Sequence, residues 1–192
     1  ADVIRCVSER VATSLRTHLP NTKKIIVLPV STPTLASRTQ VRDPGQSILT
    51  LFYAGRFAPE KRLDILFAAF DLVKKELPSA TLVLRGSGQL QSWVETEAKK
   101  REGVSLLPWT SEETFVPCSV AVLTSDHESW NRFVIMAAQR HIPVVMTDVG
   151  CAGEVLVHQE SALIVPVGDT NAIASAIIDT LKKRYGTLEM NQ

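Results

Sequence analysis

Four loops that follow apolar runs carry the glycines, cations and carboxylates that could bind a phosphate-bearing ligand. In the first loop, Gly55 and Arg56 precede Lys61 at the start of a helical pattern. A glycine lets the backbone approach a ligand, and cations near a helix N-terminus suit a diphosphate. The alternative is that Arg56 is an ordinary loop charge and Lys61 a solvated residue at the helix start.

Two further loops combine glycines with the end of an apolar run. Gly86 and Gly88 follow one run, but no third glycine completes a dinucleotide-binding fingerprint, so a tight turn explains them equally well. Another run is followed by Gly150 and Glu154. Each loop is a modest signal. Several such loops together indicate a ligand site, because ligands bind beyond the carboxyl ends of parallel strands.

The fourth loop holds Glu128, the candidate catalytic carboxylate, between an apolar run and an apolar helical pattern. Three structural alternatives stand beside that reading. Glu128 can cap the following helix, and Trp130 can pack into the core. A single histidine such as His127 is more often a structural or surface residue than a catalytic one.

Composition narrows the range of partners. The chain has 192 residues, 45% hydrophobic and 21% charged, which is typical of a globular protein with a sizeable core. The formal net charge of +1 gives no electrostatic reason to expect nucleic acid or an anionic membrane as the main partner. An anionic ligand therefore needs a local cluster of cations and backbone N–H groups.

The cysteines indicate a reducing compartment. Cys6, Cys118 and Cys151 are far apart, and no pair has the spacing of metal ligands, which favours buried or free thiols and a cytoplasmic location. No run is long and apolar enough for a transmembrane helix, and the first residues lack a signal-peptide pattern. The chain begins at Ala1 rather than Met, as expected for a piece of a longer protein.

Short β-branched runs alternate with helical patterns along most of the chain. Near-continuous apolar strands are covered on both faces, and their alternation with helices implies right-handed βαβ units. The predicted fold class is therefore α/β, with a doubly wound, mostly parallel, Rossmann-like sheet. The predicted strands are 3–7, 25–28, 48–53, 81–84, 104–107, 120–123, 144–146 and 163–165.

One polar stretch interrupts this alternation. Residues 31–47 are rich in Ser, Thr and Pro and are predicted to be a linker. They divide a β-α-β piece, residues 1–30, from a larger unit, residues 48–192. Because two strands and a helix cannot close a core of their own, the first piece either extends the main sheet or belongs to a missing neighbouring domain.

In this order and spacing, the loops resemble the C-terminal half of retaining glycosyltransferases of family 4 (group 1). Those enzymes have the B-type fold of two Rossmann-like domains. The resemblance runs from Tyr53-Ala54-Gly55-Arg56 to Val165-Pro166-Val167-Gly168-Asp169. Residues 1–30 are similar to the end of that family's N-terminal domain, which implies that the rest of an acceptor-binding domain is missing.

The resemblance implies a role for each loop. Arg56 and Lys61 would hold the diphosphate of a nucleotide diphosphate sugar, and Gly86 to Gly88 would line the base or ribose. Glu128 would lie beside the transferred sugar, where a carboxylate can bind hydroxyls or stabilise developing positive charge. The backbone at the next helix N-terminus would face the phosphates, through Ser129, Trp130, Asn131 and Arg132.

The resemblance also implies that no metal or other cofactor is needed. The acceptor, whether a sugar, a lipid or a protein, stays open. Peripheral membrane association is expected only through the missing domain.

Three positions depart from the family pattern. Met136 stands eight residues after Glu128, where the family has a second Glu that takes the ribose hydroxyls. Asn131 replaces a glycine, so its side chain is expected to narrow the approach of a phosphate. His141 replaces a small residue before the next strand. The pattern is kept around Gly55 and altered around Glu128.

The leading hypothesis is the donor-binding domain of a retaining sugar transferase. A second hypothesis, motivated by Met136 and Asn131, is a non-catalytic relative that acts as a scaffold or regulatory partner. A third is another enzyme on the same sheet, such as a sugar epimerase or a phosphorylase. Under each hypothesis the isolated chain is expected to be inactive, because the acceptor site must face the donor from a second domain.

Overall fold

The computed structural model describes residues 3–19, 24–31, 49–110 and 115–185. The strands in these ranges are β1 (Val3–Cys6), β2 (Lys24–Val27), β3 (Thr50–Ala54), β4 (Thr81–Arg85), β5 (Val104–Leu107), β6 (Val120–Leu123), β7 (Val144–Thr147) and β8 (Leu163–Val165). The helices are α1 (Glu9–Arg16), α2 (Leu63–Glu76), α3 (Gln91–Lys99), α4 (Arg132–Gln139) and α5 (Thr170–Tyr185), with a short 3-10 turn η1 (Pro59–Lys61).

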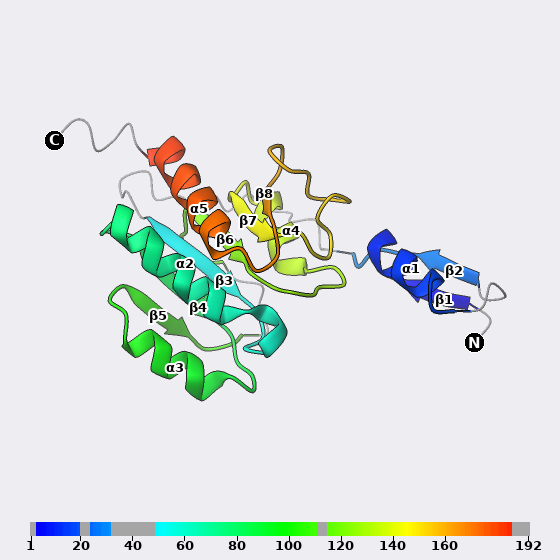
Figure 1. Ribbon diagram of the computed structural model, residues 1–192, viewed down its shortest axis with the longest axis horizontal. Helices are drawn as coiled ribbons and strands as arrows, with labels where there is room; N and C mark the ends of the chain where they lie inside the picture. Colours follow the sequence, from blue (N-terminus) through cyan, green and yellow to red (C-terminus); the bar gives the residue numbers. More distant parts are fainter. Residues whose placement is uncertain (1–2, 20–23, 32–48, 111–114, 186–192) are drawn as a thin grey trace.

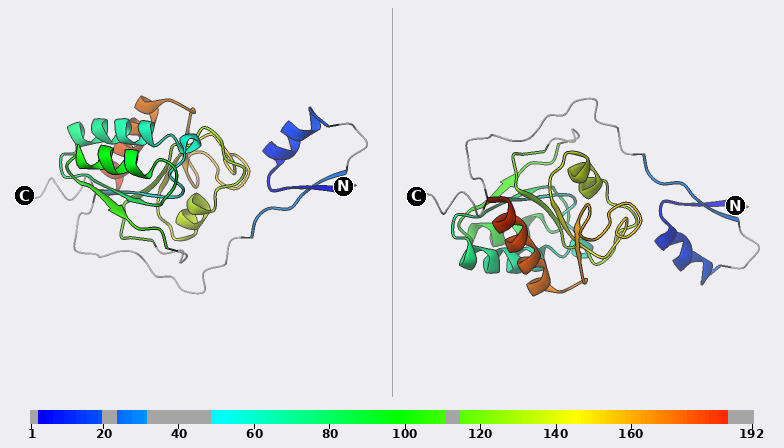
Figure 2. Two further views of the ribbon diagram at one scale, coloured as in Figure 1. Left: turned by 90° about the horizontal axis from the view of Figure 1, so that it is seen from below. Right: turned by 90° about the horizontal axis from the view of Figure 1, so that it is seen from above.

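Six strands form one parallel sheet in the order β5-β4-β3-β6-β7-β8 (Figure 1). Helices cover both faces of this sheet, with α2, α3 and α5 on one side and α4 on the other (Figure 2). The predicted α/β class with a mostly parallel, doubly wound sheet is therefore confirmed.

Burial explains why these segments became central strands and covering helices. Every residue of β6 and β7 is buried, as expected for strands packed between two helical layers. In α2, the predicted stripe of Leu63, Leu66, Phe70 and Val73 is fully buried. This helical spacing of apolar residues places one face of α2 against the sheet and α5.

The strand order creates a switch point between β3 and β6. From β3 the chain builds outwards through β4 to β5, then returns to place β6 on the other side of β3. The loops after β3 and β6 therefore leave the sheet towards opposite faces. A crevice opens between such loops at the carboxyl ends of the strands, and ligands of open α/β sheets bind there.

The N-terminal piece forms a small unit of its own. Strands β1 and β2 pair in parallel as a separate two-stranded sheet, so within the described residues they do not extend the main sheet. Helix α1 meets the larger unit at its first turn, where the backbone N–H groups of Glu9 and Arg10 each donate to the Glu154 carboxylate over 2.9 Å. Of the predicted linker, residues 32–47 lie outside the described residues.

No helix in the described part of the chain combines the length and the apolar character needed to cross a membrane.

Candidate functional site

A cavity of about 360 Å³ lies at the switch point. Four cationic side chains line it, and none of its described lining residues is a carboxylate. The cations are Arg56, Lys61, Arg85 and Arg132. The other lining residues are Tyr53, Ala54, Gly55, Trp109, Thr110, Phe115, Leu123, Asn131, Phe133 and Met136. This lining suits a ligand that carries both an anionic group and a flat apolar group.

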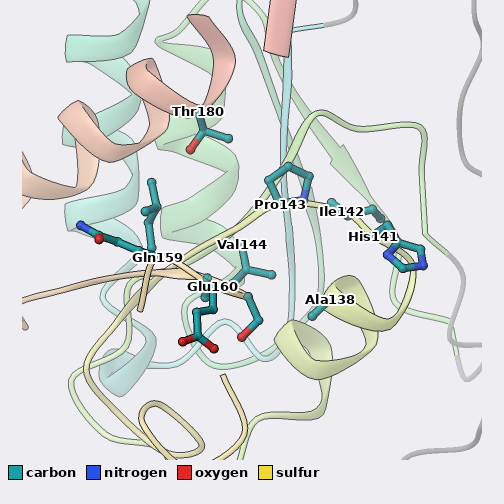
Figure 3. Close-up of a pocket in the computed structure, with 11 residues that line it drawn as sticks. Ala138, His141, Ile142, Pro143, Val144, Gln159, Glu160 and Thr180 are labelled. Atoms are coloured by element: carbon teal, nitrogen blue, oxygen red, sulfur yellow. The ribbon is translucent and has the colours of Figure 1, made fainter. Parts of the chain in front are cut away.

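A second cavity of about 450 Å³ lies at the amino ends of the strands, where β7 and β8 begin (Figure 3). His141 and Glu160 line this cavity from separate loops. Although this cavity is larger, it is at the amino ends of the strands. We assign the candidate site to the switch point, because ligands of such sheets bind at the carboxyl ends.

Close backbone packing shapes the loop after β3. The Gly55 N–H donates to the carbonyl of Arg85 over 3.0 Å, and the Tyr53 hydroxyl donates to the carbonyl of Arg56 over 2.9 Å. A Cβ at Gly55 would lie 2.8 Å from that hydroxyl, so a larger residue would displace the buried tyrosine. Burial and the negative charges of Glu128 and Glu60 raise the pKa of Tyr53, which keeps its hydroxyl protonated.

The two predicted cations of this loop differ in their surroundings. The Arg56 side chain is 75% exposed and pairs with Glu60 over 2.9 Å. An exposed pair of this kind contributes little to stability, so Arg56 can exchange it for a ligand phosphate. Lys61 is instead buried, which contradicts the alternative that it is a solvated residue at a helix start.

Lys61 and Glu128 form a buried ion pair. Their side chains are 11% and 10% exposed, and Lys61 Nζ lies 2.6 Å from Glu128 Oε1. The same Oε1 accepts from Ser125 Oγ and from Asn131 Nδ2, each over 2.8 Å. A buried carboxylate is tolerated when it is paired and hydrogen-bonded in this way. Glu128 therefore connects the loops after β3 and β6.

Three further contacts join the same two loops. Arg62 binds both carboxylate oxygens of Asp126 over 3.1 Å, and the Thr124 hydroxyl donates to the carbonyls of Lys61 and Arg62. The Asp126 N–H donates to the carbonyl of Glu60 over 2.9 Å. The roles of Arg62, Thr124 and Asp126 were not predicted, because nothing in the spacing of 124–126 indicates a partner some 64 positions earlier.

Aromatic side chains form part of the apolar lining of the cavity. Phe115 and Phe133 are stacked with ring centroids 5.5 Å apart, and the Arg140 guanidinium lies over Phe115. Met136 is buried beside them on α4 and lines the cavity. The sequence did not identify Phe115 and Phe133 as site residues, because aromatic residues within apolar stretches are typical of a hydrophobic core.

Two predicted glycines have a packing role. A Cβ at Gly86 would lie 2.1 Å from the carbonyl oxygen of Gly55, and a Cβ at Gly88 would lie 2.5 Å from that of Phe57. Both positions therefore exclude side chains because the two loops touch. Neither glycine lines the cavity, and their contact with base or ribose stays a prediction.

The loop before α4 divides into buried and exposed parts. Trp130 is 7% exposed and packs in the core, as its structural alternative proposed, while His127 and Ser129 are exposed. The N-cap of α4 is Asn131, whose Oδ1 accepts from the Val134 N–H, so Glu128 does not cap this helix. Of the four residues predicted to face the phosphates, Asn131 and Arg132 line the cavity.

The sequence comparison places the whole larger unit in one family. The sequence model of the Glycosyl transferases group 1 family matches residues 49–183, which include both loops of the switch point. The chain belongs to the group 1 glycosyl transferases.

The curated relatives of this group 1 glycosyl transferase domain are longer proteins. The chain is 24% identical over 147 residues to a glycogen synthase of Mycobacterium tuberculosis, covering 73% of the chain and 36% of the relative. It is 27% identical over 170 residues to an uncharacterized glycosyltransferase, YqgM, of Bacillus subtilis, covering 84% and 47%. The chain therefore spans less than half the length of these relatives.

Solved structures share the fold of this glycosyl transferase domain. A variant of S. aureus TarM in complex with UDP superposes with a TM-score of 0.83 at 16% identity, over 94% of this chain and 37% of TarM. Sucrose-phosphate synthase from Thermosynechococcus elongatus gives 0.79 at 22%, over 99% and 50%. HepE of Anabaena in complex with UDP-glucose gives 0.73 at 18%, over 100% and 62%.

The family departures do not all lie in one place. Asn131 and Met136 line the cavity, but His141 lies at the second cavity, beyond the opposite end of α4. The sequence alone suggested that His141 belongs to the altered side of the site. An eight-residue helix is about 12 Å long, so His141 lies about that far from this side and is not part of it. His141 has φ 56 and follows the C-cap Arg140, where a glycine or asparagine is commonly found.

The described residues hold neither a cluster of metal ligands nor a disulfide. In the described ranges, no group of three or more His, Cys, Asp or Glu side chains could hold a metal ion. Cys6 and Cys151 are buried and Cys118 is half-buried, and none of the three forms a disulfide. Burial raises the pKa of Cys151 to about 12, which keeps it protonated and unreactive.

Proposed function

We propose that this domain binds the nucleotide diphosphate sugar of a retaining, family 4 glycosyltransferase, as the C-terminal half of a two-domain enzyme. The observation that carries the proposal is the cavity at the switch point, which is lined by four cationic side chains and by two stacked aromatic rings. A nucleotide diphosphate combines an anionic diphosphate with a flat base. Structural relatives solved with UDP or UDP-glucose support a donor of this class.

Arg56 and Arg132 are proposed to bind the diphosphate. Both line the cavity, and their guanidinium groups can bind phosphate oxygens bidentately. As the sugar leaves its diphosphate, negative charge builds up on the phosphate oxygens, and fixed cations stabilise it more in the transition state than in the ground state. Lys61 adds a third positive charge, and the Glu128 carboxylate holds its ammonium group in place.

Glu128 is proposed to reach the sugar only after its contacts change. The carboxylate lies behind Lys61 and Asn131, which line the cavity, while Glu128 itself does not. A catalytic role beside the anomeric carbon therefore requires one of these side chains to move. Transfer also requires an acceptor, so we propose that the chain works with the remainder of a longer, cytoplasmic protein and without a metal.

The test is calorimetric titration of the chain with UDP, GDP and ADP, each with and without a linked glucose. We expect one base to bind, and Arg56→Ala to weaken that binding about tenfold, the loss typical of one charged hydrogen bond. Arg16→Ala is the matched control, because Arg16 is also an exposed arginine paired with a glutamate but lies on α1.

The absence of binding by all six ligands, or equal binding by Arg56→Ala, would contradict the proposal. The first outcome would favour the scaffold or regulatory role instead. Retention is tested on the full-length parent by the anomeric configuration of its product, and metal independence by its activity in a chelator.

A further inference from the structure

Asn131 makes two contacts at once from a single side chain. Its Nδ2 donates to Glu128 Oε1 over 2.8 Å, and its Oδ1 accepts from the Val134 N–H over 3.3 Å. The two contacts define the orientation of the amide, because a carboxylate needs a donor and an N–H needs an acceptor. The Asn131 side chain thereby links the buried carboxylate to the first turn of α4.

This arrangement removes two groups from the reach of a ligand. The Val134 N–H belongs to the set of unpaired donors that a helix start offers to an anion, and Asn131 occupies it. The hydrogen bonds from Lys61, Ser125 and Asn131 to Glu128 end on Oε1, and two of these donors, Lys61 and Asn131, line the cavity. A ligand in the cavity therefore meets the Asn131 amide before it meets Glu128.

The backbone at Asn131 favours a different residue. Its φ of 73 lies in the left-handed region, which glycine adopts at no steric cost and asparagine tolerates. The side chain at this position is therefore not required by the backbone. What it adds is the pair of hydrogen bonds to Glu128 and Val134.

We propose that Asn131 is the specificity-determining residue of this cavity, because its side chain occupies the space between the donor's sugar hydroxyls and Glu128. This inference rests on the proposed donor site. With the amide in place, the cavity recognises the nucleotide and its diphosphate and gains little from the linked sugar. The native chain therefore binds a nucleoside diphosphate and its glucose conjugate with dissociation constants within about threefold of each other, a difference of roughly 0.6 kcal/mol.

The test compares two substitutions at this position by the same titration, with UDP, GDP and ADP and their glucose conjugates as probes. Asn131→Gly fits φ 73 and exposes Glu128 and the Val134 N–H. We expect it to raise the preference for the sugar conjugate about tenfold, the effect of one added hydrogen bond to a charged group.

Asn131→Asp is the matched blocking variant. It keeps the size of the side chain and the cap on α4, since aspartate also accepts at an N-cap. It still stands in front of Glu128, so the preference for the sugar conjugate should not rise, while repulsion weakens both ligands. Asn171→Asp makes the same chemical change at an exposed position of α5 and should alter neither ligand.

Several outcomes would overturn the inference. One is a native preference for the sugar conjugate of tenfold or more, and another is an unchanged preference in Asn131→Gly. A rise in Asn131→Asp equal to that in Asn131→Gly would show that occupation of the space is not the cause. If Asn131→Gly failed to fold, the native preference and the response of Asn131→Asp would decide.

Failure of the proposed function has a different signature. If neither the native chain nor Asn131→Gly binds any probe, both the donor site and the inference are wrong. If only Asn131→Gly binds, the native chain is not a nucleotide sugar binder, and the predicted equal binding of the nucleoside diphosphate and its glucose conjugate by the native chain is wrong as well.

Discussion

The two sides of the switch-point cavity are built by different kinds of contact. The first wall, Gly55, Arg56 and Lys61, is shaped by backbone packing so close that Gly86 has no space for a methyl group. The second wall, Asn131, Arg132 and Met136, is shaped by side-chain hydrogen bonds and apolar packing on α4. A side chain added at Gly86, behind the first wall, must move backbone, whereas a substitution in the second wall mainly changes the chemistry that the cavity offers.

The difference between backbone packing and side-chain contacts explains the positions of the residues at this cavity that depart from the family pattern. Both Asn131 and Met136 are in the second wall. Each fits at its position, because Asn131 tolerates its positive φ and Met136 is a flexible apolar side chain buried on α4. Ligand preference can therefore change on this side while the fold and the cations on the other side stay in place.

Removing the ion pair that joins the walls is expected to have the largest effect. Lys61→Ala leaves the Glu128 carboxylate buried without its cation, which should lower the free energy of unfolding by about 3–5 kcal/mol. Urea denaturation measures the change. The paired substitution Lys61→Met with Glu128→Gln should restore most of it, since glutamine still accepts from Ser125 and Asn131. A double variant as unstable as Lys61→Ala would contradict this account.

The next largest effect tests the backbone packing of the first wall. A Cβ at Gly86 would lie 2.1 Å from a carbonyl oxygen, so Gly86→Ala should cost about 2–3 kcal/mol of stability. Gly153→Ala is the matched control. Gly153 has φ +77 and open space around it, so this change should cost only about 1 kcal/mol of backbone strain. Equal losses in the two variants would mean that close packing does not distinguish Gly86.

A smaller effect is expected from chemistry added to the second wall. Met136→Glu places a carboxylate where the cavity now has a thioether, and ribose hydroxyls can donate to it. We expect about tenfold tighter binding of the nucleoside diphosphate, and no gain for its 2′,3′-dideoxy analogue. Met136→Gln separates charge from hydrogen bonding. The absence of any gain from Met136→Glu would favour a non-catalytic domain over a weakened enzyme.

The smallest effect comes from the outer contact of Arg62. Hydrogen bonds from Arg62 hold the pKa of Asp64 below its usual value, so the ionised form of Asp64 stabilises the fold. A lowered pKa contributes stability above the ordinary aspartate pKa and loses it as the pH falls through the folded value. Because the Asp64 side chain is 53% exposed, Asp64→Asn should cost under about 1 kcal/mol near pH 7. Urea denaturation should find almost no difference near pH 2.

Much of the fold was predictable because its signals are local. The apolar runs at 81–84, 104–107 and 120–123 became β4, β5 and β6, and the helical stripe from Leu63 to Val73 became the buried face of α2. Buried parallel strands appear in the sequence as continuous apolar runs, and amphipathic helices appear as apolar residues at helical spacing. The group of loops at one sheet edge followed from the topology of parallel sheets.

The site was predicted only in part, because its decisive contacts join distant positions. Glu128 was chosen as an isolated carboxylate, yet its partner Lys61 lies 67 residues away. His141 was grouped with the altered side of the site, although α4 separates the two. Charge type and loop position are visible in a sequence, whereas the pairing of two loops depends on strand order.

By itself the sequence determined the α/β class, the elements and the loops that carry glycines and cations, since each depends on a periodicity or a short spacing. Only the tertiary structure decided which of those residues meet. It placed β6 beside β3, buried Lys61 against Glu128, and set Asn131 between that carboxylate and the cavity. The physical reason is that a buried charge takes its partner from whichever loop the fold brings within hydrogen-bonding distance.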